Sequence, residues 1–289
     1  MSAKSSSLTV ISSRPESVWQ YAHPLAMVRN LWAHRDLLQQ FTVREVMGRY
    51  KGSYLGFLWS LLTPLFMLMV YTFVFSVVFK ATWGASPSES RVEFALTLFC
   101  SLIAFNVFSE CLARAPGLIV SSPNYVKKVV FPLEILPLSV LGSALVHSLT
   151  SLVILFLGLL VFVRAIPWTA IYLPLVYLPL VGLCLGLSWF LASLGVFIRD
   201  IGYLVGVVLQ VLFFMTPIIY PISAVPAVLQ PALRLNPLCS VVEDFRRVIM
   251  WGQAPDWPWW GAVTLFSGLV TMAGYVWFMK LKRAFADVV

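Results

Sequence analysis

The chain has 289 residues, of which 60% are hydrophobic and 11% are charged, and its mean hydropathy is +0.88. A soluble domain is closer to half apolar and one quarter charged, so this composition excludes an ordinary soluble protein. Five stretches without any charged residue are each longer than the about 20 residues with which a helix crosses a bilayer. The sequence therefore predicts an all-α, polytopic membrane protein.

Two segments precede the first predicted span. Residues 1–27 are rich in serine and show no periodicity, which is typical of a flexible cytoplasmic tail. Within residues 28–51, four apolar residues from Val43 to Tyr50 recur at helical spacing and predict an amphipathic helix on the inner leaflet. A second apolar patch around Phe41 leaves open that a soluble partner also binds this helix.

Six membrane-spanning helices are predicted, five from the uncharged stretches and one that carries Glu110 near its end. Six spans place both chain ends on the same side. If that side is the cytoplasm, 14 of the 20 Lys and Arg residues lie on inner segments and 6 on outer ones, as the positive-inside rule requires. The net charge of +8 then indicates topology and contact with anionic lipid headgroups, not nucleic-acid binding. The spans are predicted at about residues 55–79, 94–113, 135–162, 170–197, 204–221 and 258–279, within a six-span transmembrane domain of residues 52–283.

A lysine pair, Lys127 and Lys128, lies between the second and third spans. At the bilayer centre each lysine would cost about 2.5–3.5 kcal/mol, so the pair cannot lie there. Pro123 and Pro132 bracket the pair, which predicts a short cytoplasmic helix or turn. Composition alone leaves two interpretations open, a topology anchor and a docking site for another protein.

The outer segment between spans 5 and 6, residues 222–257, is unusually apolar for a loop and is interrupted by three prolines. Such a segment is predicted to form short re-entrant helices, covered by protein or by a water-filled cavity. It also carries Glu243, Asp244 and Arg246. We interpret these as gate residues and structural salt bridges in preference to a catalytic cluster.

Small residues at four-residue spacing allow two helix backbones to approach closely. The sequence contains three glycine pairs of this kind, which predict helix packing and imply no substrate. They are Gly52/Gly56, Gly182/Gly186 and Gly202/Gly206.

The chain lacks the phosphate-binding motif G-x-x-x-x-G-K-[ST] and any cluster with metal-ligand spacing. It also lacks the paired charges at mid-span that ion-coupled carriers use. His147, in the third span, is interpreted as a neutral residue bonded to a neighbouring helix in preference to a proton relay. Energy for any transport must then come from another protein.

Aromatic residues gather in and near spans 1 and 5. Trp and Tyr commonly line both membrane interfaces, but Tyr71 and Phe213 lie near mid-span, where flat apolar faces suit a sliding sugar polymer. Interface anchoring, packing and channel lining all remain open. The candidates for channel lining are Trp59, Phe66, Tyr71, Phe213, Phe214 and Tyr220.

Five motifs, in this order along the chain, resemble the membrane subunits of ATP-binding-cassette exporters for cell-surface polysaccharides. They are Arg44–Leu65, Asn124–Leu138, Arg199–Ile201, Thr216–Pro221, and Asn236–Leu238 with Phe245 and Arg246. The second reads N-Y-V-K-K-V-V-F-P-L-E-I-L-P-L. The likeness extends from about Arg29 to Arg283, and residues 1–27 have no counterpart in it.

The resemblance implies a half-transporter, with two copies of this permease and two copies of a separate ATPase that binds ATP and Mg. The chain itself would hold no cofactor and would not be an enzyme. On this resemblance it would export an undecaprenyl-diphosphate-linked polysaccharide, in the first place an O-antigen, across the bacterial inner membrane. Alternatives are a capsule, teichoic acid or another amphiphile and, from a different class, a membrane-embedded enzyme that processes lipid-linked glycans.

The resemblance also implies roles for individual residues, with spans 1 and 5 lining the conduit and residues 284–289 forming a cytoplasmic end. Docking of the ATPase is implied for Arg35, Asp36, Arg44, Asn124, Tyr125, Lys127, Lys128, Arg199 and Asp200. An outer gate is implied for Pro217, Pro221, Asn236, Pro237, Glu243, Phe245 and Arg246.

Overall fold

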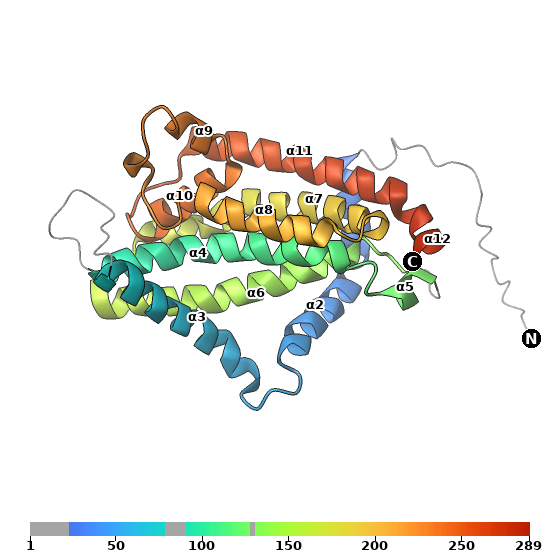
Figure 1. Cartoon of the computed structure of the whole chain (residues 1–289), viewed down its shortest axis with the longest axis horizontal. Coiled ribbons are helices and arrows are strands. Elements are labelled where there is room, and N and C mark those ends of the chain that lie inside the picture. The colour runs from blue at the N-terminus through green and yellow to red at the C-terminus, as the bar shows by residue number, and fades with distance from the viewer. Residues whose placement is uncertain (1–22, 79–90, 128–130) are drawn as a thin grey trace, which may run out of the picture.

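A computed structural model of the chain describes residues 23–78, 91–127 and 131–289 (Figure 1). This part of the chain is 82% helix and contains no strand. Within it, four helices are long and apolar enough to cross a membrane, and two apolar helices are shorter. The protein is therefore an all-helical, multi-pass membrane protein.

The helices of the described residues, in chain order, are α1 (Pro24–Ala33), α2 (Arg35–Tyr50), α3 (Trp59–Tyr71), α4 (Arg91–Arg114), α5 (Pro123–Lys127), α6 (Ile135–Gly158), α7 (Leu173–Phe197), α8 (Ile201–Met215), α9 (Gln230–Arg234), α10 (Pro237–Ile249), α11 (Trp257–Leu281) and α12 (Phe285–Val288). A π-helical segment, Thr72–Val78, continues α3, and another, Leu159–Val163, continues α6. The long helices α4, α6, α7 and α11 run side by side and form the body of the bundle (Figure 1).

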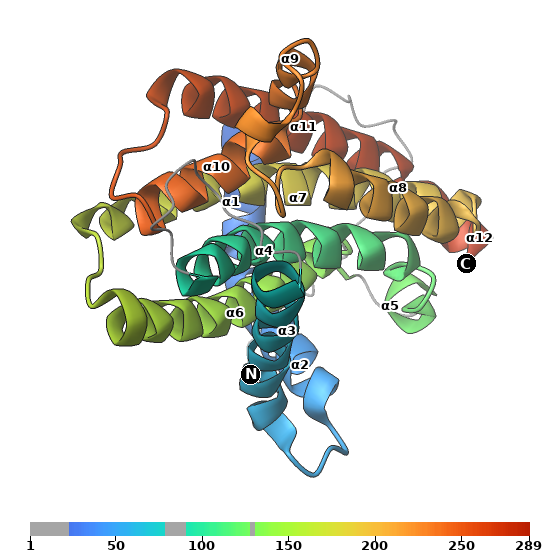
Figure 2. The same ribbon diagram turned by 60° about the vertical axis from the view of Figure 1, so that its left-hand side comes forward.

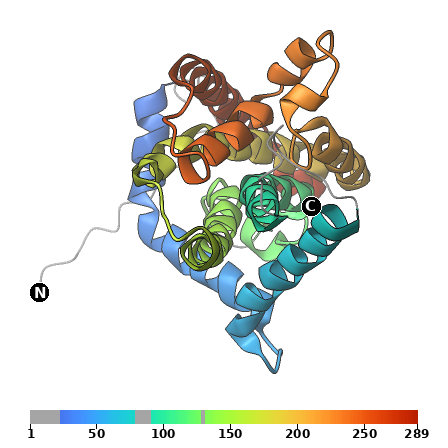
Figure 3. The same cartoon turned by 90° about the vertical axis from the view of Figure 1, so that its left-hand side faces the viewer.

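α4 lies near the centre of this bundle (Figure 3). It packs against α6, α7 and α10, and it also contacts α3 and α8. Its apolar side chains, among them Leu98, Cys100 and Val107, are buried. α4 therefore contacts most of the helices that form the sites described below.

α2 and α3 form a V that projects sideways from the bundle (Figure 1, Figure 2). The tip of the V contains Gly52 and Gly56 with φ of 86° and 50°, a left-handed conformation that favours glycine. α2 and α3 both contact α6, and α3 also contacts α4. The far side of α3 is exposed, with Phe66 54% and Met69 66% accessible. α3 is thus attached to the bundle along one side.

The single interfacial helix predicted over residues 28–51 is in fact two helices, α1 and α2. The chain bends at His34, whose φ of −106° and ψ of 18° are not helical. The His34 Nδ1 lies 2.8 Å from the Asn30 backbone oxygen, which stabilises the end of α1. The hydrophobic periodicity did not reveal this bend because the apolar stripe from Val43 to Tyr50 lies entirely after His34.

The two ends of the chain are partly helical. α1 begins at Pro24, a residue suited to the first helical position, so the tail predicted over residues 1–27 is shorter than expected. Residues 1–22 lie outside the described part of the chain. At the other end, α12 lies within the predicted cytoplasmic end, residues 284–289, and its Phe285 is fully buried.

Four predicted spans coincide with the long helices, whereas spans 1 and 5 correspond to the two shorter apolar helices. Span 5 was predicted to reach residue 221, but α8 ends at Met215. The reason is Pro217, which has no amide hydrogen and whose ring would clash with the carbonyl four residues before it. Thr216 accordingly has an extended backbone, with φ of −100° and ψ of 134°. Residue 79, the predicted end of span 1, lies outside the described residues.

The closest helix contact involving the predicted glycine pairs joins α7 to α11. A Cβ added at Gly186 would lie 2.4 Å from the Val270 carbonyl oxygen, and one at Gly274 would lie 2.0 Å from the Gly186 oxygen. Close packing is therefore confirmed for the Gly182/Gly186 pair. It is wrong for the other two pairs within the described chain, because nothing lies within 4 Å of a Cβ added there.

Candidate functional site

One end of the bundle brings together segments that were predicted to be cytoplasmic: α5, α12 and the turn between α7 and α8 (Figure 1). α2 reaches α5 through its side chains. The Arg44 guanidinium donates a hydrogen bond to the Tyr125 hydroxyl at 2.6 Å and lies 5.6 Å from the Phe41 ring. The rings of Phe41, Tyr125 and Phe131 pack against one another in tilted and edge-on arrangements, with ring centres 4.8–5.5 Å apart. Two segments about 80 residues apart in sequence thus form one surface.

The remaining residues predicted for docking are spread around this end. Asn124 and Lys127 are exposed on α5, whereas Lys128 lies outside the described residues. Arg35 and Asp36 are exposed at the start of α2 and form an ion pair with each other at 3.8 Å. The last two predicted residues are exposed in the turn before α8, namely Arg199 and Asp200.

A buried polar hub was not predicted. The Glu134 side chain is 3% exposed and accepts bonds from Lys282 at 2.6 Å and from Asn30 at 3.0 Å. Its backbone oxygen accepts a bond from the Trp189 indole at 3.0 Å, and Asn30 also donates to the Tyr275 hydroxyl. The hub joins α1, the start of α6, α7 and the end of α11.

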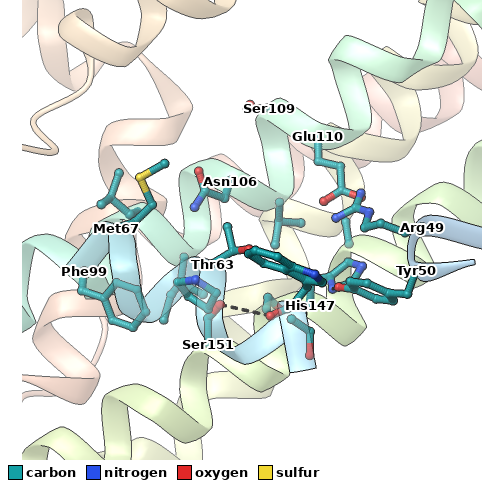
Figure 4. Close-up of a pocket in the computed structure, with 18 of the residues that line it drawn as sticks. Arg49, Tyr50, Thr63, Met67, Phe99, Asn106, Ser109, Glu110, His147 and Ser151 are labelled. Atoms are coloured by element: carbon teal, nitrogen blue, oxygen red, sulfur yellow. Dashed lines mark hydrogen bonds and ion pairs between the residues drawn. The ribbon is translucent and has the colours of Figure 1, made fainter. Parts of the chain in front are cut away.

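A cavity of about 750 Å³ lies between α3, α4 and α6, beside the end of α2 (Figure 4). Its volume is within the range of about 300–1,000 Å³ that is typical of small-molecule sites. α3 provides Trp59, Thr63 and Tyr71, α4 provides Asn106 among others, and α6 provides His147. The cavity therefore contains two of the six aromatic residues predicted to line a channel.

Ion pairs and hydrogen bonds close the α2 end of this cavity. Arg49 forms an ion pair with Glu110, so a cation from α2 meets a carboxylate from α4. The Tyr50 hydroxyl lies 3.1 Å from the His147 Nδ1. This is the kind of bond to a neighbouring helix that was expected for His147. The His147 Nε2 is buried and has no hydrogen-bond partner within the described residues.

A second hollow, of about 910 Å³, adjoins the cavity at Arg49 and Tyr50. We call it the basic groove, because four cationic side chains line it against one carboxylate, that of Glu45. Arg114 pairs with Glu45, which links α4 to α2. The cationic residues that line the groove are Arg44, Arg49, Lys51 and Arg114.

The other predicted channel residues lie outside the cavity. Phe66 on α3 and Phe214 on α8 are more than half exposed, as expected for side chains that face lipid or another subunit. Phe213 packs edge-on against Phe105 of α4, with ring centres 5.4 Å apart. The Tyr220 hydroxyl donates to the Phe214 carbonyl at 2.7 Å. The chain alone thus divides the predicted set between a cavity, a packed core and an exposed face.

The predicted outer-gate residues form a packed cluster around α10. Its central residue, Arg246, is fully buried. The Arg246 guanidinium donates to the Ser101 hydroxyl at 2.6 Å, to the carbonyls of Pro217 and Ile218, and to Glu243 at 3.4 Å. Arg246 therefore fastens α10 to α4 and to the segment that follows α8.

The rest of the predicted gate supports the same cluster. Asn236 caps α10 by accepting a bond from the Leu238 amide at 3.0 Å, and it donates to Thr216 at 3.1 Å. Pro237 follows at the first helical position. Phe245 is fully buried against Tyr177, with ring centres 4.9 Å apart. Pro221 is half-buried and starts a single 3₁₀ turn, Ile222–Ala224.

Burial shifts two pKa values in α10. Burial lowers the pKa of Arg246 to about 10, opposed by the negative charge of Glu243, so the guanidinium remains charged at neutral pH. Burial raises the pKa of Asp244 to about 6, opposed by the hydrogen bond from the Asp256 amide at 2.9 Å. Within the described residues, no group of three His, Cys, Asp or Glu side chains is placed to hold a metal ion, and all four cysteines are free and buried.

The model of the ABC-2 type transporter family matches residues 36–250. The chain belongs to this family. The transporter is also similar to curated proteins over most of its length. It is 28% identical to the O-antigen export system permease protein RfbA of Myxococcus xanthus over 91% of this chain and 99% of the relative. A protein of the same name from Klebsiella pneumoniae is 26% identical with the same coverage. The polysialic acid transport protein KpsM of Escherichia coli is 25% identical over 78% of this chain and 88% of the relative.

Sequence reasoning about the transporter missed Glu134 and Asn106. Glu134 ends the run F-P-L-E, where it could be taken as one more boundary charge. The sequence did contain a signal for the partners of Glu134, because Asn30 and Lys282 lie in segments predicted for the same side of the membrane as Glu134. Asn106 lies in the middle of a predicted span, where a polar amide points to function by default.

Proposed function

We propose that the chain is the membrane subunit of an ABC exporter that moves a lipid-linked polysaccharide, most closely an O-antigen, across the bacterial inner membrane. The observation that carries the proposal is the similarity to O-antigen export permeases along 91% of the chain, within a family of transporter membrane subunits. A hydrophilic polymer in bare lipid would leave its hydroxyls unpaired, at a few kcal/mol each, so it needs a protein-lined path.

In this proposal the chain forms a homodimer that binds two copies of a separate ATPase, and ATP and Mg are bound by that partner. α3 with its π-helical extension and α8 complete a set of six spans, and both chain ends are cytoplasmic. α9 and α10 are the short outer helices of the gate. The exposed apolar side chains of α3 and α8 support a subunit interface there, since polar residues in the neighbouring cavity would otherwise face lipid.

The surface formed by α2 and α5 is proposed to receive the ATPase. The contact between Arg44 and Tyr125 supports this assignment because it joins the interfacial helix to the loop that carries the lysine pair. Replacing Lys127 and Lys128 by Glu would reverse the charge of the loop and is expected to abolish ATP-driven export while membrane insertion stays normal. A variant that exports polymer at the normal rate would show that the pair is only a topology anchor.

The test of the function is reconstitution. Vesicles that contain the chain and its partner ATPase are expected to hydrolyse ATP and to translocate lipid-linked polysaccharide. The chain alone is expected to hydrolyse no ATP, and the purified complex is expected to contain two copies of each subunit. ATP hydrolysis by the isolated chain would contradict the proposal, and polymer synthesis in place of transport would favour a glycan-processing enzyme.

A further inference from the structure

Asn106 is a polar residue in an apolar setting. It lies within α4, the most buried of the long helices, and yet its own side chain is exposed. It makes no hydrogen bond within the described part of the chain. An amide that faces hydrocarbon without a partner is costly. The surface in front of Asn106 must therefore hold water, a ligand or another polar group.

That surface is the cavity between α3, α4 and α6, as Figure 4 shows. Thr63 of α3, an exposed residue with a hydroxyl group, also lines the cavity. His147 of α6 lines it too, but its Nε2 is buried and its Nδ1 lies 3.1 Å from the Tyr50 hydroxyl, so its ring nitrogens are not open to a ligand. Two walls of the cavity, from α3 and α4, thus offer hydrogen-bonding groups to a ligand.

The cavity also offers aromatic faces, from Trp59 and Tyr71 of α3. Amide and hydroxyl groups next to aromatic rings are suited to a sugar, since a sugar ring has hydroxyls at its edge and apolar C–H groups on its faces. The net charge of the cavity lining also suits a neutral ligand. Within the described chain, Arg49 and Glu110 are its only fully charged lining residues, and they pair with each other.

The basic groove provides the contrast. Of the four cationic side chains that line it, Arg49 is paired with Glu110 and Arg114 with Glu45. The other two, Arg44 and Lys51, have no carboxylate partner within the described residues, so an anionic group is attracted to the groove and not to the cavity. The two hollows meet at Arg49 and Tyr50, which line both. The net charge of the lining residues is therefore positive in the basic groove and about zero in the cavity, and the end of α2 separates the two.

We propose that the cavity binds neutral sugar residues of the exported polymer through Asn106, Thr63 and the Trp59 and Tyr71 rings. This assignment rests on the proposed function and names the substrate site within a single subunit. The sugar is recognised by neutral hydrogen bonds and ring contacts. An anionic lipid linkage would have to break the pair between Arg49 and Glu110 in order to enter.

The experiment measures the accessibility of a cysteine placed at Asn106. The four native cysteines are buried, so background labelling is low. In vesicles that contain the full transporter complex, N106C is expected to react with a charged, water-soluble methanethiosulfonate. A synthetic polyprenyl diphosphate that carries a short neutral oligosaccharide is expected to slow this reaction about tenfold at a concentration about ten times its Kd. The same polyprenyl diphosphate without sugar is expected to leave the rate unchanged.

Two further variants make the result interpretable. T63C reports from the opposite wall and serves if N106C does not fold. L149C is the matched control, because Leu149 is 58% exposed on α6 and is not among the cavity-lining residues. It is expected to remain unlabelled, since a thiol in lipid does not ionise.

Three outcomes would overturn the proposal: no labelling at either cavity position, equal protection by the lipid without sugar, or no protection by either probe. Export of polymer by the unmodified complex is measured in parallel. If export occurs and protection does not, the site is wrong while the proposed function stands. If the sugar probe protects but no polymer is exported, the proposed function is wrong while a sugar site remains.

Discussion

Two polar residues on opposite sides of α4 differ in burial and in hydrogen bonding. Ser101 and Asn106 are five residues apart and therefore about 140° apart around the helix. Ser101 is fully buried and accepts a bond from Arg246 of α10. Asn106 is exposed and has no bond within the described chain. On the side of Ser101 the polar group is hydrogen-bonded within the chain. On the side of Asn106 the polar group is available to water, a ligand or another subunit.

This contrast extends to the helices around α4. α7, α10 and α11 form a closed side, where helices meet backbone to backbone at Gly186 and charges are paired in the interior. α3 and α8 form an open side, with large apolar residues exposed to lipid or to a second subunit. Stability is therefore expected to depend on the closed side, and transport on the open side. Substitutions on the two sides should separate these properties.

The largest expected effect is on the closed side, at Arg246. R246M removes the cation that bonds Ser101, two carbonyls and Glu243, and leaves these groups buried or half-buried without their partner. Breaking such a buried network is expected to cost about 3 kcal/mol or more. The measurement is the free energy of unfolding, or the melting temperature, of the purified protein in detergent.

The control is the neighbouring Arg247, which is half-buried and donates to the Ala254 carbonyl at 3.0 Å. R247M is expected to cost about 1 kcal/mol. Equal losses for the two variants would show that Arg246 does not hold the closed side together.

The second comparison uses one glycine from each side. At Gly274 on α11 an added Cβ would lie 2.0 Å from the Gly186 oxygen, so G274A must push α11 away from α7, at a cost of about 1–3 kcal/mol. At Gly206 on α8 nothing lies within 4 Å of an added Cβ. G206A is expected to raise stability by about 0.5 kcal/mol, because alanine favours the helix.

The melting temperatures of G274A and G206A show whether each substitution lowers or raises stability. A stabilising G206A would indicate that no other helix packs against α8 at Gly206. A destabilising G206A in the complex but not in the isolated subunit would indicate that a second subunit packs against α8. Equal destabilisation in both states would contradict the assignment of α8 to the open side.

Much of the architecture could be predicted because hydrocarbon selects against charge. Uncharged stretches located five of the six apolar helices, and the cost of burying lysine placed Lys127 outside them, where the structure exposes it. The hydrogen-bond partners on the closed side could not be predicted from the sequence. Arg246 and Ser101 are 145 residues apart, and nothing in their local sequence names one as the partner of the other.

The sequence also predicted in part which residues lie together. The motifs placed Arg44 and Tyr125 in one functional group, and the structure brings them together. The aromatic candidates did not behave as one set, because exposure depends on which neighbour each ring meets. Phe213 meets Phe105 of α4, whereas Phe214, the next residue, is 57% exposed. Helical periodicity separates neighbours onto different faces, but it does not say which face is covered.

The third prediction concerns the hub at Glu134, which ties the N-terminal helix to the closed side. E134Q would leave Lys282 without its counterion while keeping a side chain that can accept from Asn30. The expected loss is about 1.5 kcal/mol, the value of a hydrogen bond to a charged group. Thermal unfolding is the measurement, and protease cleavage at α1 should become faster because α1 is held less firmly.

The control for this hub is Asp36, whose pair with Arg35 is largely exposed. D36N is expected to change stability by less than about 0.5 kcal/mol, because exposed ion pairs contribute little. If E134Q behaves like D36N, the hub does not hold α1.

The smallest predicted effect is a pH dependence at Asp244, which lies in α10 outside the spanning helices. The pKa of Asp244 is raised from 3.8 to about 6 in the folded protein, chiefly by burial. Between these values the folded protein binds more protons than the unfolded chain, so its stability falls as pH rises through this window. From pH 5 to pH 7 the loss is about 1 kcal/mol. D244N can still accept the bond from the Asp256 amide but cannot ionise, so the stability of the wild type relative to this variant should decrease over that range. A difference in melting temperature that stays constant from pH 5 to pH 7 would show that Asp244 is already ionised at the lower pH, and that this part of the closed side tolerates a buried charge.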